Sequence, residues 1–139
     1  MRAIDKIIIH CSDTKENVFF NSEDIQAWHL QRGFNDIGYH YVILLDGTVE
    51  LGRDVLLVGA HAYGHNQHSI GICYIGGLDS DETPKDTRTP LQKEALSKLL
   101  KKIKECFKDV EILGHRDLPN VSKACPSFDA KEEYKNLKP

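Results

Sequence analysis

The sequence lacks a long apolar run. The longest one near the N-terminus is Ile7–Ile9, which is too short for a signal-peptide core or a membrane-spanning helix. We therefore expect a protein with no membrane span that is cytoplasmic as synthesised. No internal repeat, linker or low-complexity segment is visible, and 139 residues fit one domain covering residues 1–139.

A strong excess of charge is also missing. The formal net charge is -3, and the charged fraction of 28% is ordinary for a globular domain. Proteins that bind nucleic acid through its phosphates usually carry a basic field. The composition therefore argues against a nucleic-acid partner. A hydrophobic fraction of 40% is enough for a sizeable core.

Short two-ligand metal motifs such as HExxH are absent, yet potential metal ligands are plentiful. The chain has four cysteines and seven histidines. In a reducing compartment, free thiols are either small core residues or metal ligands. Cys11 and Cys73 lie in apolar strand patterns, so we expect them to be core thiols that do not form a disulfide.

Strand and helix patterns alternate along the chain. Apolar runs predict strands at 6–11, 39–45, 48–51, 69–75 and 110–114. The Asp46-Gly47 pair between two of these runs predicts a hairpin with a type I′ turn. Helices are predicted after Asn21 or Ser22, after the capping box that begins at Thr89, and near Ser127 or Asp129. The interleaving predicts an α/β fold with a central mixed sheet flanked by helices.

Three potential metal ligands follow the ends of predicted strands. His10 ends the first strand, His115 follows the last one, and Cys125 lies in a loop ten residues further on. Open α/β sheets place ligand sites at strand ends. Two neutral imidazoles and a thiolate form a zinc set that leaves a fourth position for water. The spacing alone also fits a core histidine, a surface histidine and a buried cysteine.

Other polar residues have equally plain structural interpretations. Tyr39 and His40 lie at the start of the predicted hairpin and fit ordinary packing, and Lys123 fits a solvated loop. His61, His65 and His68 fall close together in sequence. They fit a short metal-binding tract, but we favour the interpretation that they line a polar groove.

Several longer segments together resemble one known family. They are HCSDT at 10–14, WHLQRGFNDIGYHYVILLDGTVELGRD at 28–54, VGAHAYGHNQHSIGICYIGG at 58–77 and KACPSFD at 123–129. These segments are similar, in order and spacing, to the zinc-dependent N-acetylmuramoyl-L-alanine amidases. That class includes phage amidase-type lysozymes, which resemble this sequence most, and the peptidoglycan recognition proteins. The fold implied by the resemblance agrees with the predicted mixed sheet.

The resemblance implies one zinc ion per chain. His10, His115 and Cys125 fall on the family's metal ligands. One stretch departs from the phage pattern, because GHRDLP at 114–119 is closer to intracellular recycling amidases, which use aspartate as the third ligand. Here KACPS supplies a cysteine instead. The departure puts the substrate contacts of that loop in doubt but not the ligands.

The resemblance also implies roles for four further residues. Tyr39 and Lys123 fall on residues that act in catalysis. His61 and Asn66 lie where the family binds its substrate.

The implied function is zinc-dependent hydrolysis of the amide bond between N-acetylmuramic acid and L-alanine of the stem peptide. This predicts an endolysin-like hydrolase, related to phage or prophage, whose partner is peptidoglycan or muropeptides. We expect a monomer that acts on the cell wall after release, or on recycled muropeptides. One alternative is a recognition module that binds peptidoglycan without cutting it, although such relatives usually lack the cysteine at Cys125. A cytoplasmic regulator that acts through protein contacts is another.

Overall fold

A five-stranded mixed sheet forms the centre of the fold. The computed structural model describes residues 2–139. The strand order is β4-β3-β5-β1-β7, and the strands are β1 (Lys6–Cys11), β3 (Tyr41–Ile43), β4 (Val49–Leu51), β5 (Ser69–Tyr74) and β7 (Glu111–Gly114). A separate two-stranded sheet pairs β2 (Thr14–Lys15) with β6 (Gly77–Leu78).

Four of the five central strands are parallel. Strand β1 pairs with β5 and with β7, so Lys6 lies opposite both Ser69 and Glu111. Strand β3 pairs in parallel with β5 and antiparallel with β4. The C-terminal ends of β1, β5 and β7 therefore meet at one edge of the sheet, where α/β folds place their ligand sites.

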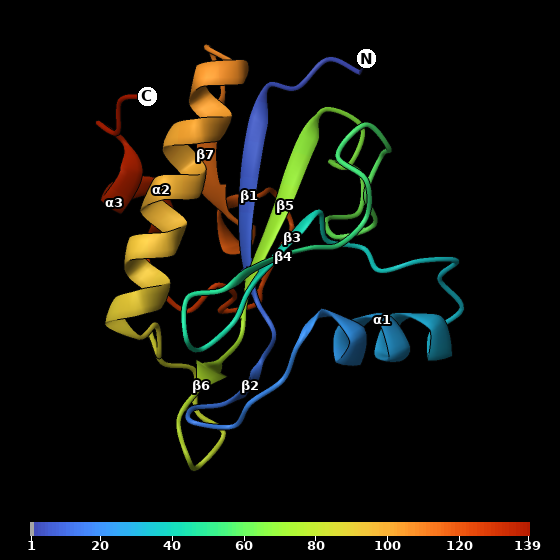
Figure 1. The fold of residues 1–139 in the computed structure, drawn as a ribbon, viewed down its shortest axis with the longest axis vertical. Coiled ribbons are helices and arrows are strands. Elements are labelled where there is room, and N and C mark those ends of the chain that lie inside the picture. Colours follow the sequence, from blue (N-terminus) through green and yellow to red (C-terminus); the bar gives the residue numbers. More distant parts are fainter. Residues whose placement is uncertain (1) are drawn as a thin grey trace.

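Helices cover both faces of the sheet, as Figure 1 shows. The helices α2 (Pro90–Cys106) and α3 (Ala130–Tyr134) lie on one side, and α1 (Ser22–Gln31) lies on the other. Side chains alternate along a strand, so Ile7 and Ile9 of β1 pack with Leu96 of α2. Val42 and Cys73 pack with the α1 side. The predicted α/β fold is confirmed. Among residues 2–139, no helix has the length and apolar character needed to cross a membrane.

The helix starts follow the predicted capping residues. The side chains of Asn21 and Thr89 each accept a hydrogen bond from the third helical N–H and form full capping boxes. The side chain of Asp129 accepts from the N–H of Glu132 at the start of α3. These bonds satisfy N–H groups that have no partner inside the helix.

The hairpin between β3 and β4 has a different turn from the one predicted. The N–H of Leu44 pairs with the carbonyl of Thr48, and the N–H of Gly47 donates to the carbonyl of Leu44, both at 2.9 Å. Gly47 has a φ of 86°, whereas Asp46 is not among the residues with positive φ. The loop thus has three residues and ends in a glycine bulge. The prediction of a type I′ turn is wrong, because the strand register leaves one more residue in the loop than that turn contains.

The four cysteines are free thiols in the structure, with Cys106 exposed and Cys11, Cys73 and Cys125 buried. We expect thiol titration of the unfolded protein, without reductant and with a chelator present, to find four reactive thiols per chain. Burial in a packed core protects Cys11, Cys73 and Cys125 from oxidation in the folded state. A lower count that recovers on reduction would contradict this expectation.

Candidate metal centre

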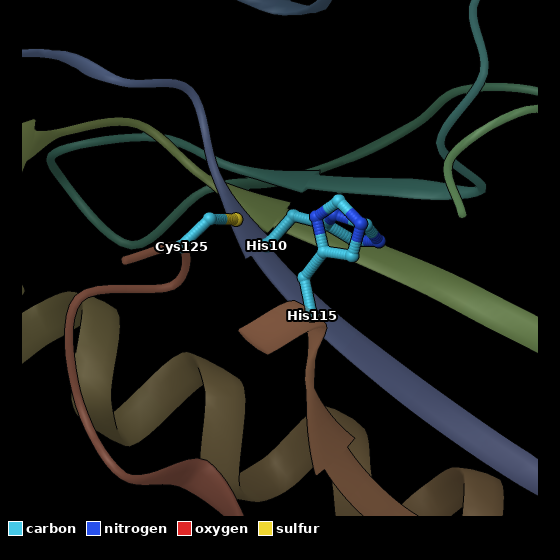
Figure 2. Close-up of side chains that lie close together, drawn as sticks. All are labelled: His10, His115 and Cys125. Atoms are coloured by element: carbon cyan, nitrogen blue, oxygen red, sulfur yellow. The ribbon is translucent and has the colours of Figure 1, made fainter. Parts of the chain in front are cut away.

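The three predicted metal ligands meet at the C-terminal edge of the sheet. His10 is next to last in β1 and only 1% exposed. His115 opens a short 3-10 helix, His115–Asp117, directly after β7. The candidate ligand atoms of His10, His115 and Cys125 all lie within 4.8 Å of one another. Figure 2 shows the three side chains pointing toward one another.

The loop that carries Cys125 is held against β1 and the 3-10 helix. The backbone N–H of Cys11 donates to Sγ of Cys125 at 3.3 Å, and the N–H of Arg116 donates to its carbonyl at 2.9 Å. Gly114 lets this loop approach closely, because a Cβ atom there would lie 2.7 Å from Cδ of Pro126.

The donor set fits a tetrahedral metal ion of the zinc type. Zinc takes imidazole nitrogen and thiolate sulfur at about 2.0–2.3 Å, which puts neighbouring donors in this set about 3.3–3.6 Å apart. The candidate ligand atoms lie within 4.8 Å of one another, so they need to approach by at most about 1.5 Å. Three protein ligands leave one position open, which is the arrangement of catalytic zinc sites.

Electrostatics favour neutral imidazoles at this centre. Burial lowers the pKa of His10 well below its usual value, and nearby His61, His115 and Lys123 lower it further. Burial also lowers the pKa of His115, and the charge of Lys123 adds to the effect. A neutral imidazole keeps a lone pair that can bind a metal.

A groove of about 660 Å³ opens directly over the three ligands. All four other site residues expected from the sequence line it: Tyr39, His61, Asn66 and Lys123. Its remaining walls include aromatic and polar side chains that we did not single out as site residues, among them Asp13, Trp28, Arg32, Phe34 and Tyr63. All five lie within the segments quoted above at 10–14, 28–54 and 58–77, so the family resemblance held a signal for them.

Tyr39 lies beside the metal ligands as a neutral phenol. Its ring centroid is 5.0 Å from that of His10. Burial raises the pKa of Tyr39 well above its usual value, so the hydroxyl keeps its proton at neutral pH. A protonated phenol can both accept and donate a hydrogen bond, which suits it to orient a water molecule.

Asn66 and His61 are tied to each other as well as to the groove. Oδ1 of Asn66 accepts hydrogen bonds from the N–H groups of His61 and Ala62 at 3.0 and 2.9 Å. Nδ1 of His61 lies 2.8 Å from Nε2 of His10. These two residues therefore support the ligand shell in addition to facing the groove.

Of the four remaining histidines, His29 lines the groove, whereas His40, His65 and His68 do not. Among the described residues, the lining includes neither His65 nor His68, and Nδ1 of His68 contacts the carbonyl of Ala3 at 2.9 Å. The prediction that His61, His65 and His68 together line the groove is thus wrong for the latter two. His40 is buried and its Nδ1 accepts from the N–H of Gly71, which fits the packing interpretation.

Fold and site together define a class: a hydrolase-type α/β domain with its chemistry at the ends of parallel strands. Comparison with known proteins narrows the class. The model of the family "N-acetylmuramoyl-L-alanine amidase" matches residues 1–128. The endolysin of Klebsiella phage KP32 is 42% identical over 126 residues, which cover 91% of this chain and 82% of the phage protein.

Solved structures agree with this result. The endolysin amidase LysCS of Clostridium intestinale superposes with a TM-score of 0.81 at 29% identity, covering 96% of this chain and 82% of the other. Drosophila PGRP-LB superposes with a TM-score of 0.79 at 27% identity, covering 98% and 82%. The chain belongs to the N-acetylmuramoyl-L-alanine amidase family. Its reaction is hydrolysis of the amide bond between muramic acid and the stem peptide of peptidoglycan.

Proposed function

We propose that this amidase is zinc-dependent and binds one zinc ion through His10, His115 and Cys125. The observation that carries the proposal is the convergence of these three donors beneath an open groove. When bound, zinc supplies Lewis acidity that lowers the pKa of water to about 7 and polarises the scissile carbonyl. The set of two neutral imidazoles and one thiolate keeps a net positive charge, which favours that chemistry.

We assign Lys123 and Tyr39 roles in stabilising the transition state of the hydrolysis. Lys123 lines the groove, and its positive charge lowers the pKa of both His10 and His115. It stabilises the oxyanion that develops when the carbonyl is attacked, a contribution of roughly 3 kcal/mol for one such donor. The phenol of Tyr39 orients the attacking water and passes a proton toward the leaving nitrogen.

The groove accommodates a muropeptide stem across the ligands. His61 and Asn66 line the groove and contribute to substrate binding, and Lys123 and its loop line it as well. We also propose that the active form is a monomer. We further propose that the enzyme reaches cell-wall peptidoglycan after release from the cell that makes it, or acts on recycled muropeptides, in keeping with its phage endolysin relatives.

Digestion of purified peptidoglycan tests the assignment. We expect peptides that begin with free L-alanine, together with glycan strands whose muramic acid lactyl groups are unsubstituted. Mass spectrometry of the soluble products identifies both ends, and a chelator-treated sample serves as the control. New reducing sugar ends would indicate a glycosidase and remove the assignment. Binding of the wall without any new ends would instead favour the recognition module.

A further inference from the structure

The imidazole of His61 is held in one place by packing. A Cβ atom added at Gly71 would lie 2.6 Å from Cγ and Cδ2 of this ring, and one added at Gly59 would lie 2.8 Å from Cδ2. The ring therefore lies directly against two backbone positions that carry no side chain. Asn66 fixes the backbone of the same residue through its Oδ1. Such confinement leaves the ring little freedom to rotate.

Both ring nitrogens of His61 have hydrogen-bond partners. The carbonyl oxygen of His65 can only accept, and this fixes the direction of each hydrogen bond in the series. Oγ of Ser69 lies 2.7 Å from the carbonyl oxygen of His65, so the hydroxyl proton is used there. Nε2 of His61 lies 3.3 Å from the same Oγ, which can then only accept. Nε2 of His61 therefore carries the proton, and its Nδ1 has the lone pair.

The same assignment of donors and acceptors extends to His10, the proposed metal ligand. Nδ1 of His61 lies 2.8 Å from Nε2 of His10 and accepts from it. Two ring nitrogens at this distance share one proton, so the nitrogen that has the lone pair accepts and its partner donates. A neutral His10 with its proton on Nε2 has a bare Nδ1.

We propose that His61 is a positioning residue that, with Ser69 and the carbonyl of His65, holds His10 as the Nε2–H tautomer and reserves Nδ1 for the metal. This inference rests on the proposed zinc function. It assigns His61 a task in the protein itself, separate from substrate contact. Outer hydrogen bonds of this kind fix the orientation of ligating histidines and raise metal affinity by about 10–100-fold.

A matched pair of variants separates the hydrogen bond from the volume. His61→Asn keeps an acceptor near the position of Nδ1, and His61→Leu has nearly the same size without one. We expect His61→Leu to raise the dissociation constant for zinc by about 10–100-fold and His61→Asn to change it only a few-fold. Competition with a chromophoric chelator measures this constant without substrate. His68→Leu, outside the groove lining, is the control and should match the unmodified chain.

NMR of the zinc-loaded, nitrogen-15-labelled chain identifies which ring nitrogen of His10 binds zinc. We expect two-bond nitrogen–proton correlations to show His10 bound through Nδ1 with a proton on Nε2. Ser69→Ala should keep this pattern with a weaker zinc affinity, because His61 then loses the partner that fixes its own tautomer.

The outcomes distinguish this inference from the proposed function. Zinc bound to His10 through Nε2, or equal affinities for the Asn and Leu variants, would overturn the role of His61 alone. Failure of the unmodified chain to bind zinc through His10, His115 and Cys125 would overturn the proposed metal centre itself. If His61→Leu does not fold, the spectrum of the unmodified zinc-loaded chain still decides the question.

Discussion

Replacing Cys125 by serine should nearly abolish zinc binding and amidase activity. Serine has almost the same size, but its hydroxyl stays neutral at pH 7 and is a poor zinc ligand. The loss of affinity should exceed the roughly 100-fold that outer-shell changes cost, because a direct ligand is removed. Elemental analysis of the purified protein measures the zinc content, and activity on peptidoglycan is measured in parallel.

Two other cysteines provide the controls for this experiment. Cys11→Ser changes the neighbouring buried thiol, whose Sγ lies 3.2 Å from Oδ1 of Asp13, a contact that serine can also make. Cys106→Ser changes an exposed thiol on α2. Both variants should keep one zinc ion per chain. A Cys125→Ser protein with full zinc content and full activity would contradict the ligand assignment.

The second large effect is a loss of catalytic rate, which we expect when Lys123 is replaced. Replacing this residue by methionine keeps most of the apolar stem and removes the charge. We expect the catalytic rate to fall by roughly 10²–10³-fold, the range found when one oxyanion donor is removed. Zinc content and binding of wall fragments should change little, because Lys123 is an exposed loop residue that is not a ligand. Steady-state kinetics on soluble muropeptides separate the catalytic rate from KM.

Tyr39→Phe is the companion variant, since it removes only a hydroxyl and should lower the rate by about 100-fold or more. Lys131→Met, at an exposed position on α3, controls for loss of a positive charge elsewhere. If both site variants keep the full rate, the amidase assignment stands but the proposed roles in the transition state do not.

Local patterns predicted most of the secondary structure. The β-branched run at 6–11 and the capping residues Asn21 and Thr89 specify their elements through nearby residues alone, and the structure confirms all three. The small sheet of β2 and β6 was not predicted. Each of its strands has two residues, which is too short for any periodicity to appear, and their pairing depends on where the long strands bring them.

The site was predictable in its residues but not in its connections. His10 lies near the end of β1 and His115 directly follows β7, positions that a pattern reveals, and the family resemblance then supported these two residues and Cys125 as a ligand set. The bond from His10 to His61 had no signal in the sequence, because it joins two segments through the packing of a ring against Gly71. Nothing in the spacing of His61, His65 and His68 indicated that only the first would face the groove.

The pairing of β1 with strands from the middle and the end of the chain has a consequence for folding. These contacts are far apart in sequence, and such topologies fold slowly because long loops must close before the pairing stabilises them. The segment with His10 is synthesised before β7, His115 and Cys125. A nascent chain therefore lacks the complete proposed zinc site until Cys125 has emerged. Zinc uptake should accordingly report the pairing of β1 with β7 rather than nucleate an earlier step of folding.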